Sequence, residues 1–168
     1  MIREIIKQCL VQSISGDPWH GFSVDALLTD VNAEQAAAHP IPGAHSMVEI
    51  VLHLAAWTQE AASRLRGDTP GLPAIGDWPG HEGDAASAWE SARQALHEAH
   101  AGLLGALGDC PEDRLAEMVG SGREPALGTG VSFTIMLLGI AQHDAYHAGQ
   151  LALLRRALAA QRPESSED

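Results

Sequence analysis

The sequence is poor in the residues that build β-sheets. It contains one Tyr, two Phe and few runs of Val, Ile or Thr, and aromatic residues make up only 4% of the chain. Strands favour β-branched and aromatic residues, so an extensive sheet is not expected. The chain is rich instead in Ala, Leu, Glu, Gln and Arg, which are good helix formers. Its 168 residues suit one domain, and we expect that domain to be all-α.

Basic residues are also few. Ten Lys and Arg stand against 22 Asp and Glu, which gives a formal net charge of -12. A nucleic-acid backbone or an anionic membrane surface requires a basic face, so neither is an expected partner. Lys7 is the single lysine, and we attribute the preference for Arg, Ala and Gly to the codon usage of a GC-rich bacterial genome.

Cysteine, signal and membrane features are scarce as well. Cys9 and Cys110 are far apart and follow no metal-binding spacing, as is typical of free thiols in a reducing cytoplasm. The N-terminal residues are charged and lack the apolar stretch of a signal peptide, and no run of 18 apolar residues exists. We therefore expect a cytoplasmic location.

Helix-capping and helix-breaking residues divide the chain into four long helices and two short ones. The long helices are predicted at about residues 2–13, 47–66, 84–107 and 131–160, and the short ones at 24–30 and 33–38. Segments 67–80 and 110–130 are rich in Gly and Pro and are predicted to be loops. We expect four antiparallel helices in a four-helix bundle, with residues 1–162 forming the domain and 163–168 a disordered tail.

The last long helix carries two histidines in an apolar seam. The seam runs through Met136, Ile140, His143, His147 and Leu151 at spacings of three and four residues. His143 and His147 therefore project from the same face, one turn apart, where both imidazoles can bind one ion.

His53 is the third candidate ligand. It lies among apolar residues of the second long helix, between Leu52 and Leu54, so its side chain is expected to point inward. Burying three unpaired imidazoles would be costly, and a shared metal ion would satisfy them together. Histidines that only pack in the core are the alternative.

Other histidines and other types of site are less well supported. His39, His81, His97 and His100 are expected at the surface, whereas His20 and His45 lie in segments that lead into the bundle. The Glu-x-x-His pairs of di-iron bundles and the His-Glu-x-x-His motif of zincins are absent. Asp144 is expected to point away from the histidine pair into solvent.

Two histidine motifs resemble those of the DinB-like (DinB/YfiT) superfamily of metalloenzymes. They are His53-Leu-Ala-Ala-Trp57 and His143-Asp-Ala-Tyr-His147-Ala-Gly-Gln150, and the segments Trp19-His-Gly21 and Gly43-Ala-His-Ser46 add to the similarity. The resemblance extends over nearly the whole chain. It implies a four-helix bundle in which His53, His143 and His147 bind Zn, Ni or a similar ion.

The resemblance also implies a class of activity. Relatives include S-transferases and isomerases that use a low-molecular-weight thiol, such as mycothiol or bacillithiol, and some hydrolases. Trp57 and Gln150, each about one turn from a predicted ligand, are pocket candidates together with His20. The alternative for Trp57 is core packing, and the alternative for Gln150 is an interhelical contact. We expect the open metal position to be covered by the segment around Trp19 and His20 and by the loop 110–130.

Three classes of function remain open at this point. The first is a metal-dependent enzyme, and here a thiol-dependent S-transferase is favoured over a hydrolase. The second is a non-catalytic metal-binding or ligand-sensing bundle. The third is a structural protein whose histidines only pack in the core. The expected partners are a small-molecule substrate and, in a homodimer, a second copy of the chain. The sequence decides neither the oligomeric state nor the native metal, and its charge gives no support for contact with DNA.

Overall fold

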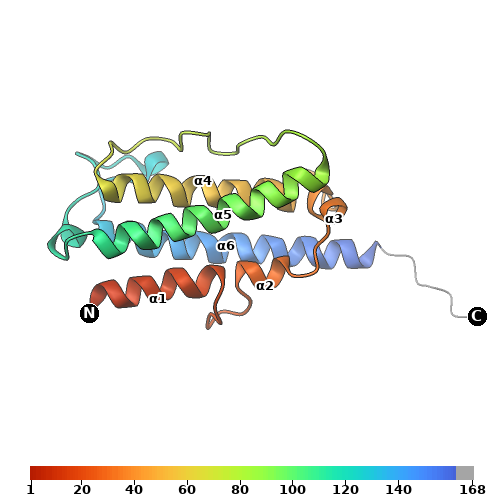
Figure 1. Ribbon diagram of the computed structural model, residues 1–168, viewed down its shortest axis with the longest axis horizontal. Helices are drawn as coiled ribbons and strands as arrows, with labels where there is room; N and C mark the ends of the chain where they lie inside the picture. Colours follow the sequence, from red (N-terminus) through yellow and green to blue (C-terminus); the bar gives the residue numbers. More distant parts are fainter. Residues whose placement is uncertain (162–168) are drawn as a thin grey trace, which may run out of the picture.

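The computed structural model describes residues 1–161, which form six α-helices and no β-strand, as expected for an all-α protein (Figure 1). The helices are α1 (Ile2–Ile14), α2 (Val24–Leu28), α3 (Ala33–Ala37), α4 (Met47–Arg66), α5 (Ala85–Asp109) and α6 (Phe133–Ala160). Two 3-10 turns, η1 (Asp113–Ala116) and η2 (Pro125–Leu127), lie between α5 and α6. The predicted tail, 163–168, lies outside the described residues.

The ends of the helices follow from local capping chemistry. At the start of α4 the Ser46 hydroxyl accepts a hydrogen bond from the Glu49 N–H, and the Glu49 carboxylate accepts one from the Ser46 N–H, which completes the predicted capping box. Gly67 ends α4 at a φ of 114°, a left-handed conformation that glycine adopts without strain. None of the helices within residues 1–161 is long and apolar enough to cross a bilayer.

The long helices are not all antiparallel, and the prediction was wrong on this point. One apolar cluster joins the first halves of α4 and α5, through Val48 and Trp89, and a second joins their last halves, through Leu65 and Leu107. These two helices therefore run in the same direction, while α6 runs against α4 (Figure 1). Segment 67–84 is long enough to return along the whole of α4, whereas a short loop would have required antiparallel neighbours.

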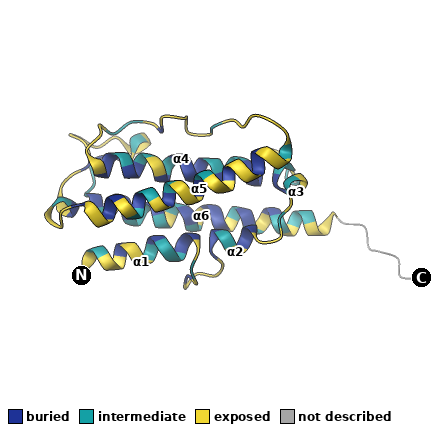
Figure 2. Cartoon of the chain, in the orientation of Figure 1, coloured by how far each residue is buried: buried dark blue, intermediate teal, exposed yellow. Residues whose placement is uncertain are grey.

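The core is divided into two apolar clusters with polar side chains between them. One cluster lies around the N-terminal half of α4 and the other around its C-terminal half. The buried polar side chains at the level between them come from four helices: Ser13, His53, Thr58, His100, Asp144 and His147. Buried positions face inward on every long helix (Figure 2). The interior thus contains a polar layer, and polar groups there require partners.

Arg64 fixes the two loops that flank this layer. Its side chain is only 4% exposed. The guanidinium donates hydrogen bonds to the Glu60 carboxylate and to the carbonyls of Leu127 and Gly71, each at 2.7 Å. Glu60 also accepts a hydrogen bond from the Gly71 N–H. One buried ion pair therefore holds both segment 67–84 and η2 against α4.

Replacing Arg64 with Met should lower the free energy of unfolding by about 3 kcal/mol, because Glu60 would remain buried without its cation. Urea denaturation followed by circular dichroism measures this change. Arg66→Met is the matched control, since exposed Arg66 makes, within residues 1–161, a hydrogen bond only to the Gly102 carbonyl; it should cost less than about 1 kcal/mol. Equal effects of the two substitutions would contradict the role of Arg64.

Candidate metal centre

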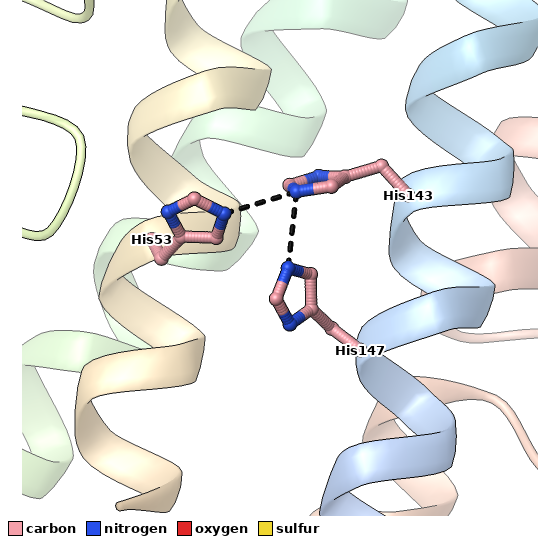
Figure 3. Close-up of side chains that lie close together, drawn as sticks. All are labelled: His53, His143 and His147. Carbon is pink, nitrogen blue, oxygen red and sulfur yellow. Dashed lines mark hydrogen bonds between the residues drawn. The ribbon is translucent and has the colours of Figure 1, made fainter. Parts of the chain in front are cut away.

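His53 of α4 and the pair His143 and His147 of α6 meet in the polar layer (Figure 3). The Nε2 atom of His143 lies 3.0 Å from Nε2 of His53 and 3.1 Å from Nε2 of His147. The seam spacing of α6 brings its two imidazoles to one side, and the antiparallel packing of α4 brings the third opposite them. The structure thus places the three predicted ligands together.

Hydrogen bonds to the opposite ring nitrogens set the tautomers of two imidazoles. Nδ1 of His53 donates to the Asp77 carbonyl at 2.6 Å, and Nδ1 of His147 donates to the Gln150 side-chain oxygen at 2.8 Å. Since a neutral imidazole carries one proton, Nε2 of both rings presents a lone pair. Such outer partners orient the histidines of metal sites.

The three imidazoles cannot satisfy one another. His143 can donate one Nε2 proton to His53 or to His147, but not to both, so at least one of these two neighbours keeps an Nε2 lone pair without a donor, about 3 Å from His143. Nitrogens bound to one ion at about 2.0–2.1 Å lie about 3 Å apart themselves. The donor set and its spacing therefore fit a divalent cation that accepts all three lone pairs.

The surroundings also keep the imidazoles neutral, the state that binds metal. Burial lowers the pKa of His143 to about 4, and the neighbouring His147 and His53 add to the effect. Burial likewise lowers the pKa of His53, opposed by its hydrogen bond to Asp77, and that of His147, opposed by its hydrogen bond to Gln150.

An indole that the sequence pattern did not predict covers one side of the cluster. Trp78 of the crossing segment 67–84 stacks on His53 with ring centroids 3.9 Å apart, and His45 stacks on the other face of the indole at 3.6 Å. The neighbouring Asp77 accepts hydrogen bonds from His53, through its carbonyl, and from Trp57, through its carboxylate. A signal was present, since Gly76-Asp-Trp-Pro-Gly80 sets a large aromatic residue inside a glycine- and proline-rich loop.

The predicted pocket residues have different outcomes. Gln150 contacts His147 itself, and Trp57 lies one turn beyond His53 with its N–H bound to Asp77. His20 is exposed and lies with Trp19 and Ala141, on the face of α6 opposite His143. The structure therefore does not bring His20 to the cluster.

The expected cover around Trp19 is wrong. Trp19 is fully exposed, at 101%, and segment 67–84 covers the histidines instead, because it has to return along α4. Loop 110–130 contributes only further along the helices, where Leu127 contacts Arg64.

Two predictions about exposure are also wrong. Asp144 is 1% exposed rather than solvated, because its face of α6 packs on α1, where its carboxylate accepts a hydrogen bond from the Ser13 hydroxyl at 2.7 Å. Burial raises the pKa of Asp144 to about 7, opposed by Ser13. His100 is buried too, and its Nε2 donates to the Leu10 carbonyl. Both residues belong to the polar layer.

Comparison with known proteins agrees with these residues and this fold. The family profile of the DinB superfamily matches residues 23–151, which include all three histidines, and the chain belongs to this superfamily. A search of curated proteins finds no match.

Replacing His53, His143 or His147 with Ala should abolish stoichiometric metal binding, since two imidazoles hold an ion weakly. Elemental analysis of purified protein after equilibration with Zn²⁺ or Ni²⁺ measures occupancy. Gln150→Ala should keep the stoichiometry but weaken affinity by about tenfold, because it releases His147. His97→Ala is the control, as this exposed imidazole lies apart, 3.4 Å from Asp25. Full occupancy in His147→Ala would contradict the ligand assignment.

Metal binding should persist below the ordinary histidine pKa of 6.5. The folded-state pKa values of all three imidazoles are lowered, so the rings stay neutral as the pH falls through 6.5, and His143 gains its proton only near its pKa of about 4. Protonated imidazole cannot bind metal, and the ion should be lost in that lower range. Competitive titration from pH 8 to pH 4 tests this, and half-loss at pH 6.5 or above would contradict it.

Proposed function

We propose that this protein is a metal-dependent enzyme built on a four-helix bundle, in which His53, His143 and His147 hold one zinc or nickel ion. The observation that carries the proposal is that Nε2 of His143 lies about 3 Å from Nε2 of both His53 and His147, in a cluster with more lone pairs than protons. Membership of the DinB superfamily supports it.

A bound divalent ion supplies Lewis acidity, which lowers the pKa of a thiol or a water and so provides a nucleophile near neutral pH. The chain's own groups fix the rest of the site. The Asp77 carbonyl and Gln150 hold His53 and His147 in the tautomers that present Nε2. Trp78 shields the His53 ring from water on one side.

The reaction we favour is thiol-dependent S-transfer. A low-molecular-weight thiol loses its proton to solvent, its sulfur forms a bond to an electrophilic carbon, and the leaving group departs with the electron pair of the broken bond. A thiol has a pKa near 8.5 and needs no strong protein base. Sulfur is also a ligand that suits zinc.

Hydrolysis is the second candidate, and Asp77 is the observation that favours it. Its carboxylate lies 3.3 Å from Nδ1 of His53 and is half-exposed. Of the described carboxylates it is the one whose charge raises the pKa of all three imidazoles. It could accept a proton from an attacking water, whereas S-transfer does not require it.

The discriminating assay mixes metal-loaded or metal-stripped protein with monochlorobimane, alone and with bacillithiol, mycothiol or glutathione, and in parallel with an ester panel. Transferase activity should require both metal and thiol, should be lost in His147→Ala and should survive in Asp77→Asn, which retains the oxygen that binds Trp57. Ester hydrolysis without a thiol that fails in Asp77→Asn would support the hydrolase instead. Metal binding with no turnover of either kind would indicate a non-catalytic metal-binding protein.

A further inference from the structure

The seam between α4 and α6 continues past the three histidines as a groove of about 240 Å³. Trp57 lies one turn beyond His53 and Ile140 nearly one turn before His143, and both line the groove at its histidine end. Arg64 and Leu127 line its other end, about 16 Å along the axis of α4 from His53. The groove therefore begins beside the candidate metal centre and leads away from it.

The walls of this groove are mainly apolar. Ala61, Leu127, Ile135, Met136 and Ile140 contribute aliphatic surface. Ile135 is 55% exposed, so the groove presents apolar surface that no other part of the described chain covers. A volume of about 240 Å³ is below the roughly 300–1,000 Å³ of pockets for drug-sized ligands. It suits one small, mostly apolar molecule.

Two arginines lie at the groove, and within residues 1–161 only one of them is without a carboxylate partner. Arg64 is paired with Glu60 and donates its other hydrogen bonds to backbone carbonyls. Arg123 is exposed, donates one hydrogen bond to the Thr129 carbonyl, and forms no ion pair within residues 1–161. In a chain with a net charge of -12, an unpaired guanidinium at an apolar groove selects for an anionic group.

We propose that this groove binds the second substrate, a small molecule with an apolar body and a terminal carboxylate, with the carboxylate on Arg123 and the far end directed toward the three histidines. The inference rests on the proposed function for what happens at that far end. The binding itself depends only on the groove and Arg123, so the two can fail separately.

Substitution of a glycine that lines the groove can block it without backbone strain. Gly139 lines it, and a Cβ added there would meet nothing within 4 Å, so Gly139→Leu places a side chain in open space without backbone strain. Gly105→Leu is the matched control, because it also meets nothing within 4 Å but lies exposed on α5, outside the groove. Arg123→Gln removes the charge, Arg123→Lys retains it, and Arg93→Gln on α5 is the control for charge.

The experiment measures binding of the carboxylates from butanoate to decanoate, and of their primary amides, by calorimetry with metal-loaded and metal-stripped protein. The mid-length carboxylates should bind about tenfold more tightly than their amides, and Arg123→Gln should remove this preference. Arg123→Lys and Arg93→Gln should preserve it. Gly139→Leu should abolish binding of acid and amide alike, whereas Gly105→Leu should not.

Metal occupancy, measured on the same samples, separates this inference from the proposed function. Loss of carboxylate selectivity without loss of metal is the expected signature of Arg123→Gln. Any one of four results would overturn the proposal. These are equal binding of acids and amides, unchanged selectivity in Arg123→Gln, unchanged binding in Gly139→Leu, and no binding of the whole series to protein that holds its metal. Protein that binds carboxylates as expected but no metal would refute the proposed function instead.

Discussion

The site depends on a mismatch between protons and lone pairs. His53 and His147 each carry their single proton on Nδ1, which donates it to the Asp77 carbonyl and to Gln150, respectively. Their unprotonated Nε2 atoms therefore face His143. No choice of tautomer for His143 satisfies both neighbours. A cation relieves this arrangement, while a fourth hydrogen-bonding side chain would have to enter a space in which Nε2 of His143 already lies about 3 Å from both neighbouring nitrogens. The arrangement therefore favours metal binding over a packed histidine core.

The polar layer explains how such a cluster is tolerated inside an apolar bundle. Apolar clusters lie on both sides of it and carry the packing, so that the level of the histidines contributes little apolar burial. Two other polar groups of the layer have partners: one carboxylate oxygen of Asp144 accepts a hydrogen bond from Ser13, and His100 donates one to the Leu10 carbonyl. These two contacts also tie α1 to α6 and to α5. The helix that carries His143 is thereby held from the side opposite the ligands.

The sequence predicted well whatever depends on short-range periodicity. Helix boundaries fell within a few residues, because capping residues such as Ser46 act locally, and the spacing of His143 and His147 fixes their common face. It predicted poorly what depends on which elements pack together. Asp144 lies one residue, or about 100°, from His143, and only the presence of α1 on that side makes it buried. Trp78 has no periodic context at all, and its position over His53 follows from the path of a loop.

The direction of α5 decides the path of segment 67–84. Because α5 runs parallel to α4, segment 67–84 has to pass over the middle of α4, where His53 lies. The same passage brings the Asp77 carbonyl to Nδ1 of His53 and the Trp78 ring onto the His53 imidazole. Arg64 then fixes the beginning of this segment and the turn η2 with one guanidinium. The cover of the histidines and the far end of the groove are thus anchored at the same point. A bundle with antiparallel α4 and α5 could retain all three histidines, but its short connection would leave His53 without the acceptor that sets its tautomer, and the mismatch on which the site depends would be lost.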